Sequence, residues 1–180
     1  DFSSLGAARR DGVYSVLASA MRRPRQEILD TLERSGERGR GGAAFSTGAK
    51  WRAAAHSANP ERLVVANGDE GDPGSFVDRA LLEADPHAVL EGMALCARAI
   101  DAREGYVRSE YPRARDRISA AVAEARAAGV LGPSVLGSGE SFEVSVVSGR
   151  GSYVCGEETA LLNALEGRRG EVRLRPPYPV

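Results

Sequence analysis

The fold is indicated first by residues 63–76, which read LVVANGDEGDPGSF. Leu63–Ala66 is a short apolar run of the kind that buried strands show, and the polar, glycine-rich stretch after it is typical of a loop. Beyond the loop, Asp85 can cap a helix and Pro86 can occupy its first turn. This order of strand, loop and helix predicts the first part of a β–α–β unit.

The same alternation recurs along the rest of the chain. A second strand is expected at Gly105–Glu110 and a third at Phe142–Ser148, each followed by a helical pattern. Strands that alternate with helices of this length form parallel sheets with right-handed crossovers. We therefore expect an α/β protein in which a Rossmann-like parallel sheet is flanked by helices.

The chain before the first strand is expected to be helical. Apolar residues at helical spacing predict short helices over residues 13–20 and 24–36, and a third helix beginning near Ser46. We expect a helical N-terminal segment with the start of a glycine-rich loop over residues 1–45. The Rossmann-like domain is then expected over residues 46–180.

The composition is that of an ordinary globular protein. Of 180 residues, 42% are hydrophobic and 27% are charged, and the formal net charge is −1. A chain of this length indicates one domain. The near-neutral charge favours neither nucleic acid nor an anionic membrane as a partner, and the apolar runs are too short to cross a bilayer. We expect no direct membrane insertion and a cytoplasmic location.

Cys96 and Cys155 are the only cysteines in the sequence. Two thiols do not form a disulfide framework, which indicates a reducing compartment, and they are too few to ligate an iron–sulfur cluster. His56 and His87 have no acid or thiol beside them at metal-binding spacing, so each is expected at the surface. No metal site is predicted.

A second informative stretch is GRGGAAFSTGAKW, residues 39–51. Its glycines let backbone N–H groups approach a ligand closely, and successive N–H groups before a helix form a concave anion site. Lys50, the only lysine among 24 basic residues, would add a compact positive charge for a phosphate. The stretch is not a Walker A loop, and the alternative is a glycine-rich connection with an incidental lysine.

Two polar loops follow the first and third expected strands, where the carboxyl ends of a parallel sheet commonly bind ligands. Carboxylates accept hydrogen bonds from hydroxyl and N–H groups, so converging loops would suit a phosphorylated, polyhydroxylated cofactor or a dinucleotide. The alternatives are a solvated turn, acids that only favour a helix N-terminus and, with poor spacing, a calcium site. The polar candidates in the two loops are Asn67, Asp69, Glu70, Asp72, Tyr153, Glu157 and Glu158.

Three segments together carry a family resemblance. The chain closely resembles the NADH-binding, FMN-containing flavoprotein subunit of respiratory complex I in GRGGAAFSTGAKW (39–51), NGDEGDPGSFVDR (67–79) and SYVCGEETALLNALEG (152–167). The same module occurs as the diaphorase subunit of NAD-reducing hydrogenases and NAD-dependent formate dehydrogenases. The likeness covers essentially the whole chain beyond residue 10, including the tail RLRPPYPV (173–180).

The resemblance implies an NADH dehydrogenase module that binds FMN and NADH and accepts hydride from NADH onto the flavin. Glu70 and Glu157 are then the expected catalytic residues. Electrons are expected to pass singly to iron–sulfur electron-transfer subunits of a larger complex, which would place the module peripherally on a membrane. The implied flavin-binding residues are Gly39, Gly41, Gly42, Lys50, Asn67, Asp69, Glu70, Gly156 and Glu157. The implied NADH-binding residues are Phe45, Asp72, Glu158, Arg175 and Tyr178, with Tyr153 also assigned to the cofactor site.

Several positions depart from the family pattern. Ala53 stands where an aromatic residue usually flanks the adenine, Arg175 replaces a lysine that contacts the nucleotide, and Asp72 is one methylene shorter than the usual glutamate. The family continues beyond this stretch, and a [4Fe–4S] cluster is expected only in that C-terminal part. The alternative function is a nucleotide- or flavin-binding structural module without redox activity of its own, and the choice between NADH and NADPH stays open.

Overall fold

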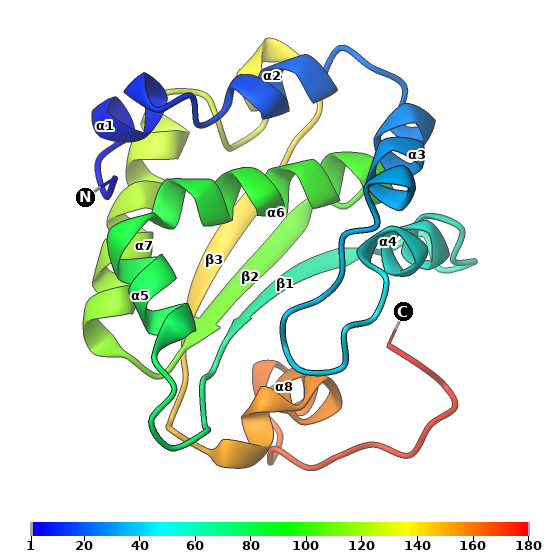
Figure 1. Ribbon diagram of the computed structural model, residues 1–180, viewed down its shortest axis with the longest axis vertical. Coiled ribbons are helices and arrows are strands. Elements are labelled where there is room, and N and C mark those ends of the chain that lie inside the picture. The colour runs from blue at the N-terminus through cyan, green and yellow to red at the C-terminus, as the bar shows by residue number, and fades with distance from the viewer. Residues whose placement is uncertain (1, 180) are drawn as a thin grey trace.

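The centre of the structure is a three-stranded parallel sheet (Figure 1). A computed structural model describes residues 2–179. The strands β1 (Leu63–Gly68), β2 (Glu104–Ser109) and β3 (Glu143–Ser148) lie side by side in that order. In the register of the sheet, Val65 lies opposite Tyr106, which lies opposite Ser145. The expected α/β fold with a parallel sheet is confirmed.

One face of the sheet is covered by the helices of the two crossovers (Figure 1). Alternate strand residues point into this layer, so that Val107 of β2 and Val144 of β3 are almost completely buried, as are Leu90 and Ile118 on the helices. The core therefore lies between the sheet and its helices. The crossover helices are α5 (Val77–Ala84) and α6 (Pro86–Ile100) between β1 and β2, and α7 (Pro112–Ala127) between β2 and β3.

Helix α5 is an element that the apolar pattern does not indicate, since the sequence predicts only the helix that starts at Asp85. Asp85 accepts a hydrogen bond from the N–H of Ala88 and caps α6, with Pro86 in the first turn, as expected. The cap of α5 is different. The carboxylate of Glu70 accepts from the N–H of Val77, seven residues away, so local spacing carries no sign of it.

Four helices precede β1 and pack beside α6. They are α1 (Leu5–Arg10), α2 (Ser15–Ala20), α3 (Arg25–Ser35) and α4 (Thr47–Ala55), of which α1 lies where the sequence has no apolar period. The hydroxyl of Tyr14 lies 2.8 Å from Nδ1 of His87 and ties this segment to α6. His87 is 0% exposed, so its expected surface position is wrong, because the N-terminal helices cover it. The division of the chain at residues 45 and 46 stays a prediction.

After β3 the chain turns at the carboxyl ends of the strands and runs below the sheet in Figure 1. It forms a short 3-10 helix, η2 (Tyr153–Gly156), then α8 (Glu158–Leu165) and a tail without regular structure. A similar short turn, η1 (Val135–Gly137), lies between α7 and β3. Within residues 2–179, every helix is too short or too polar to cross a bilayer.

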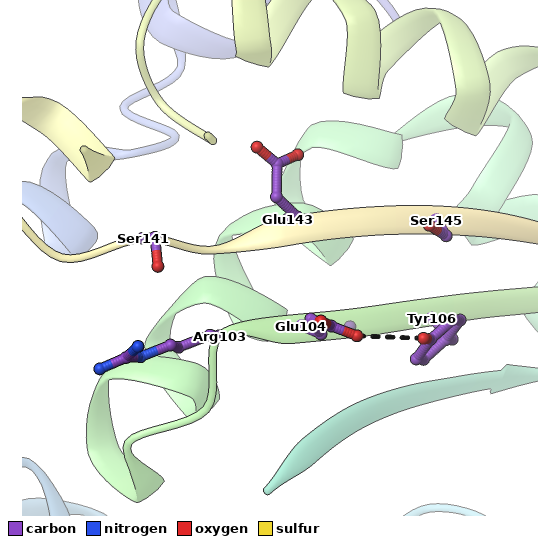
Figure 2. Close-up of a pocket in the computed structure, with 7 residues that line it drawn as sticks. Arg103, Glu104, Tyr106, Ser141, Glu143 and Ser145 are labelled. Carbon is purple, nitrogen blue, oxygen red and sulfur yellow. Dashed lines mark hydrogen bonds between the residues drawn. The ribbon is translucent and has the colours of Figure 1, made fainter. Parts of the chain in front are cut away.

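On the second face of the sheet, polar side chains lie along β2 and β3 toward the amino ends of the strands (Figure 2). Glu104, Tyr106 and Ser145 alternate with core residues along β2 and β3, and the Tyr106 hydroxyl donates to Glu104 at 3.2 Å. They line a hollow of about 470 Å³ together with Arg103, Gly105, Ser141 and Glu143. The polar loops singled out in the sequence lie at the other ends of the strands, so this hollow is separate from the candidate site.

Candidate functional site

The loops that follow β1 and β3 meet at the carboxyl ends of the strands. The side-chain amide of Asn67 donates to the carbonyl of Gly156 at 2.9 Å, which joins the end of β1 to η2. Gly71 lies so close to Tyr153 that a Cβ on it would be 2.8 Å from the Cα of Tyr153. The two acidic loops therefore come together, as their positions after parallel strands predict.

The glycine-rich loop between α3 and α4 extends toward α8 (Figure 1). Its neck is closed by two hydrogen bonds, from the N–H of Gly39 to the carbonyl of Phe45 at 2.9 Å and from the N–H of Thr47 to the carbonyl of Glu37 at 3.0 Å. Its tip is open, because a Cβ on Gly41 or Gly42 would meet no protein atom within 4 Å. The loop therefore leaves space beside its backbone for a ligand.

Helix α4 is held firmly behind this loop. Ser46 caps the helix by accepting from the N–H of Ala49 at 3.3 Å. A Cβ on Gly48 would meet Cα of Glu33 at 2.8 Å, so α4 packs directly on the backbone of α3. Arg52, one turn further on, donates to Glu33 at 2.6 Å. These contacts fix the start of α4, from which the side chain of Lys50 extends.

Lys50 is part of a charge cluster that joins three distant segments. Its Nζ lies 3.2 Å from Oε2 of Glu158 at the start of α8. Glu158 also lies 3.0 Å from Nη1 of Arg175 in the tail, and Arg175 pairs in turn with Glu157. The four side chains are partly exposed, and their charges balance. We call Lys50, Glu157, Glu158 and Arg175 the charge cluster.

Glu157 caps α8 from within the charge cluster. Its Oε2 accepts hydrogen bonds from the N–H groups of Thr159 and Ala160, each at 2.9 Å, and from the Thr159 hydroxyl at 2.6 Å. Burial raises the pKa of the Glu157 carboxyl, but these hydrogen bonds and that from Arg175 outweigh it, so the pKa is lowered. Glu157 is therefore an ionised acceptor at neutral pH.

Glu70 has the corresponding position at the start of α5. Its carboxylate accepts from the hydroxyl of Ser75 at 2.9 Å and from the N–H groups of Val77 and Asp78 at 2.7 and 3.1 Å. Burial raises the pKa of the Glu70 carboxyl, but the hydrogen bonds from Asp78, Ser75 and Arg79 outweigh it and lower the pKa. Both expected catalytic carboxylates are thus helix caps that stay ionised.

Asp69 is the one acid of the two loops that is buried. It is 8% exposed and forms an ion pair with Arg108, which lies on β2 and is 4% exposed. Its N–H donates to the side-chain oxygen of Asn67 at 3.1 Å. A Cβ on Gly149, the first residue after β3, would overlap Oδ1 of Asp69. The carboxylate is therefore enclosed between the loops of all three strands.

The remaining expected ligand residues are exposed around this centre. Phe45, Tyr153 and Tyr178 are 61%, 70% and 67% exposed, and Asp72 is also exposed. Exposed aromatic side chains such as these can stack on planar ligand rings. Phe45 belongs to the glycine loop, whereas Asp72, Tyr153 and Tyr178 lie on three other segments of the chain.

The structure adds three residues that sequence reasoning did not single out. Arg108 pairs with Asp69, and the buried Thr159 accepts from the N–H of Arg173 at 2.9 Å, which anchors the tail on α8. Arg173 also donates to Asn163 at 2.8 Å. A lone arginine inside an expected strand was a signal for Arg108, because a charge that becomes buried in a sheet needs a partner.

The donor and acceptor groups at the site fit an anion linked to hydroxyl groups. Open backbone at the glycine loop and the ammonium of Lys50 suit a phosphate. Oδ1 of Asp69 is buried and accepts no hydrogen bond within residues 2–179, so it suits a ligand hydroxyl. The same part of the chain contains no group of three or more His, Cys, Asp or Glu residues arranged to hold a metal ion.

Comparison with known proteins identifies relatives over nearly the whole chain. The family model described as the Nuo51 FMN-binding domain matches residues 32–180. A subunit of the NADH-quinone oxidoreductase of Aquifex aeolicus is 46% identical over 173 residues, which are 95% of this chain and 40% of that protein. The HndC subunit of the NADP-reducing hydrogenase of Solidesulfovibrio fructosivorans is 47% identical over 92% of this chain and 34% of that protein.

A solved structure gives the same correspondence in three dimensions. A chain of the NAD⁺-reducing [NiFe]-hydrogenase, crystallised in the H₂-reduced state, superimposes with a TM-score of 0.77 and 40% identity. The match covers 89% of this chain and 28% of that chain. The sequence thus spans less than half the length of the relatives it matches.

Proposed function

Because the chain belongs to the Nuo51 FMN-binding domain family, we propose that it binds FMN and NADH at the carboxyl ends of its strands. In this proposal it is the NADH-oxidising module of a larger oxidoreductase subunit. The observation that carries the proposal is the meeting of an open glycine loop, the single lysine and the acidic loops of the sheet at one place. The open backbone of the loop, the Lys50 ammonium and the unpartnered Asp69 oxygen support this assignment.

The glycine loop and Lys50 would hold the FMN phosphate. Backbone N–H groups at Gly39, Gly41 and Gly42 can approach an anion closely because no side chain stands in the way. The ammonium of Lys50 already lies beside a carboxylate oxygen of Glu158, at 3.2 Å, and a phosphate oxygen has the same charge and acceptor character. Phosphate binding would therefore replace one anionic partner of Lys50 by another.

The polyol and ring system of FMN would lie along the acidic loops. Asn67, Asp69 and Gly156 are connected by hydrogen bonds or close packing, so they form one rigid side of the site. Glu70 and Glu157 would act at the catalytic centre as ionised acceptors, since their pKa values are lowered. We propose that they orient reacting groups and hold the adjacent helix N-termini, with no role as proton donors.

NADH would bind on the exposed rim of the site. Phe45, Tyr153 and Tyr178 offer exposed rings, while Glu158 and Asp72 can accept hydrogen bonds from ribose hydroxyls. Arg175, which bridges Glu157 and Glu158, can contact the dinucleotide phosphates. Bound FMN would supply the hydride acceptor for NADH and the ability to release electrons one at a time.

The onward path of the electrons is part of the same proposal. The longer relatives are named as subunits of an NADH-quinone oxidoreductase and of a hydrogenase. We propose that this module likewise passes electrons to iron–sulfur subunits of a larger complex. A [4Fe–4S] cluster would belong to the C-terminal part of the longer subunit, since this chain has only two cysteines.

Flavin reconstitution tests the proposed function. The purified chain is mixed with FMN, freed of unbound flavin and titrated with NADH without oxygen while the flavin absorbance is recorded. We expect a yellow protein whose flavin band bleaches on addition of NADH. Failure to retain FMN at high micromolar concentration contradicts the proposal, whereas retention without bleaching points to the alternative of a flavin-binding module without redox activity.

A further inference from the structure

The buried pair of Asp69 and Arg108 has a feature that an ordinary structural ion pair lacks. Oδ2 of Asp69 faces Nη1 of Arg108, so one end of the carboxylate is neutralised. Both oxygens are buried and accept no hydrogen bond from the described residues, and Oδ1 also lacks an ion-pair contact. A buried carboxylate oxygen without a donor is costly, and in a native protein it commonly has a partner from outside the chain.

The position of this oxygen points to a ligand. Oδ1 lies against Gly149, where a Cβ would overlap it, so glycine keeps the place between the loops of β1 and β3 free. The backbone of Asp69 is fixed, because its N–H donates to Asn67 and its carbonyl lies near Gly156. The free acceptor is therefore held where both polar loops meet.

Stability alone does not account for the pair. The free energy lost when two charges are removed from water is about as large as the free energy gained from their attraction. A protein with a well-packed apolar pair in their place is often equally stable. Arg108 is also the third residue on its face of β2, after Glu104 and Tyr106, which are exposed or half-buried. Arg108 is therefore the one buried charged residue of β2, and it lies at the end of the strand from which the acidic loops are reached.

We propose that Arg108 is a positioning residue for flavin binding. Through its ion pair it holds the Asp69 carboxylate turned so that Oδ1 accepts a hydrogen bond from a hydroxyl of the flavin polyol chain. This inference rests on the proposed function, because it assumes that a flavin occupies the site. It assigns a role to a residue that has almost no exposed surface and contacts the ligand only through Asp69.

The test uses the full 180-residue chain and two flavins without a phosphate. Riboflavin carries the polyol chain, and lumiflavin carries a methyl group in its place. Dissociation constants are measured by quenching of flavin fluorescence for the unsubstituted chain, Arg108→Met, Asp69→Asn and the double variant. Arg115→Met is the matched control, because Arg115 donates to the carbonyls of Ser109 and Glu110 in the same loop and not to Asp69.

We expect Arg108→Met to weaken riboflavin binding by roughly 10- to 100-fold, the range for a hydrogen bond to a charged group. Lumiflavin binding should change by less than about twofold, and the double variant should bind riboflavin as Asp69→Asn does, within about twofold. Arg115→Met should leave the riboflavin-to-lumiflavin ratio unchanged. If Arg108→Met does not fold, Arg108→Lys, which keeps the charge, takes its place. It should weaken riboflavin binding by less than Arg108→Met would, and it should leave lumiflavin binding unchanged.

Three results overturn the inference. Equal losses on both flavins mean that Arg108 only maintains the fold, and additive losses in the double variant mean that it does not act through Asp69. An unchanged riboflavin constant means that the pair is not used for binding. If the unsubstituted chain binds neither flavin, the proposed function itself fails and the role of Arg108 falls with it.

Discussion

The glycine loop at residues 39–45 and the junction of the two acidic loops use the same residue type for opposite purposes. A Cβ on Gly41 or Gly42 would meet nothing within 4 Å. At the junction, a Cβ on Gly149 would lie 2.8 Å from the backbone nitrogen of Glu110, and one on Gly71 would lie 2.8 Å from Cα of Tyr153. Glycine leaves open space beside the backbone in the first region, and in the second it lets the backbones of neighbouring loops pack closely.

Because the glycines of the two regions have different surroundings, we expect substitutions in one region to affect ligand binding and those in the other to affect stability. At Gly41 in the glycine loop, whose backbone is not in the left-handed region, an added methyl group should leave folding unchanged and interfere with a bound phosphate. At the junction, the same methyl group should force the backbone of neighbouring loops apart. The distinction would be wrong if a substitution in the glycine loop destabilised the fold, or if one at the junction left the stability unchanged.

The largest effect is expected for Gly149→Ala. The added Cβ would overlap Oδ1 of the buried Asp69 and lie 2.8 Å from the backbone nitrogen of Glu110, which cannot move aside as a flexible side chain would. We expect the free energy of unfolding to fall by about 3 kcal/mol or more, measured by urea denaturation of the chain without ligand. A loss below about 0.5 kcal/mol would show that the loops are not in firm contact.

The next largest effect is expected on ligand affinity for Lys50→Arg. A planar guanidinium fork keeps the charge but cannot take the place of a compact ammonium beside the open glycine loop. We expect the FMN dissociation constant to rise by roughly 10- to 100-fold, measured by fluorescence quenching. Riboflavin, which has no phosphate, is the control and should bind as before. An unchanged FMN constant means that Lys50 does not contact the phosphate.

A smaller, pH-dependent effect is expected for Glu70, the acid that supports the junction by capping α5. Its folded-state pKa lies below the unfolded value of about 4.3, so its contribution to stability is present above that value and is lost as the pH falls through the folded pKa. Glu70→Gln should lower the free energy of unfolding by about 1 kcal/mol at pH 7 and by less near pH 3.

The control for this prediction is Glu61→Gln, since Glu61 is exposed and its side chain has no hydrogen bond or ion pair within the described residues. Its substitution should change stability little at either pH. If Glu70→Gln lowers the free energy of unfolding equally at both pH values, the ionised cap is not the source of the stability.

The smallest effect on folding is expected for Gly41→Ala. Its backbone is not in the left-handed region and its surroundings are open, so the free energy of unfolding should change by less than about 0.5 kcal/mol. The FMN dissociation constant should nevertheless rise, by roughly threefold to tenfold, because the methyl group stands between backbone and phosphate. Unchanged FMN affinity together with unchanged stability would place the phosphate elsewhere.

Much of the fold could be predicted because its signals are local. The apolar run at 63–66, the later strands and the turn residues between them fix a parallel sheet, and loops after parallel strands meet at one edge. Asp85 and Pro86 likewise mark the start of α6 within a few residues. Each of these signals depends on neighbours in the sequence.

The features that sequence reasoning missed depend on contacts made only in the folded chain. Glu70 caps α5 across a loop, Arg108 pairs with an acid on the adjacent strand, and His87 is covered by helices from the N-terminus. Residue type indicates that such groups need partners but does not say which. The charge cluster has the same origin, since Lys50 and Glu158 lie 108 positions apart.

The most direct test of the phosphate site compares the affinity of the unsubstituted chain for FMN and for riboflavin. The two ligands differ only in the phosphate, so the ratio of their dissociation constants isolates the contribution of the phosphate, which we assign to the glycine loop and Lys50. We expect FMN to bind at least about tenfold more tightly, the effect of one charge-assisted hydrogen bond, and the advantage to shrink at high salt. Equal dissociation constants for the two flavins would contradict a phosphate site at the glycine loop.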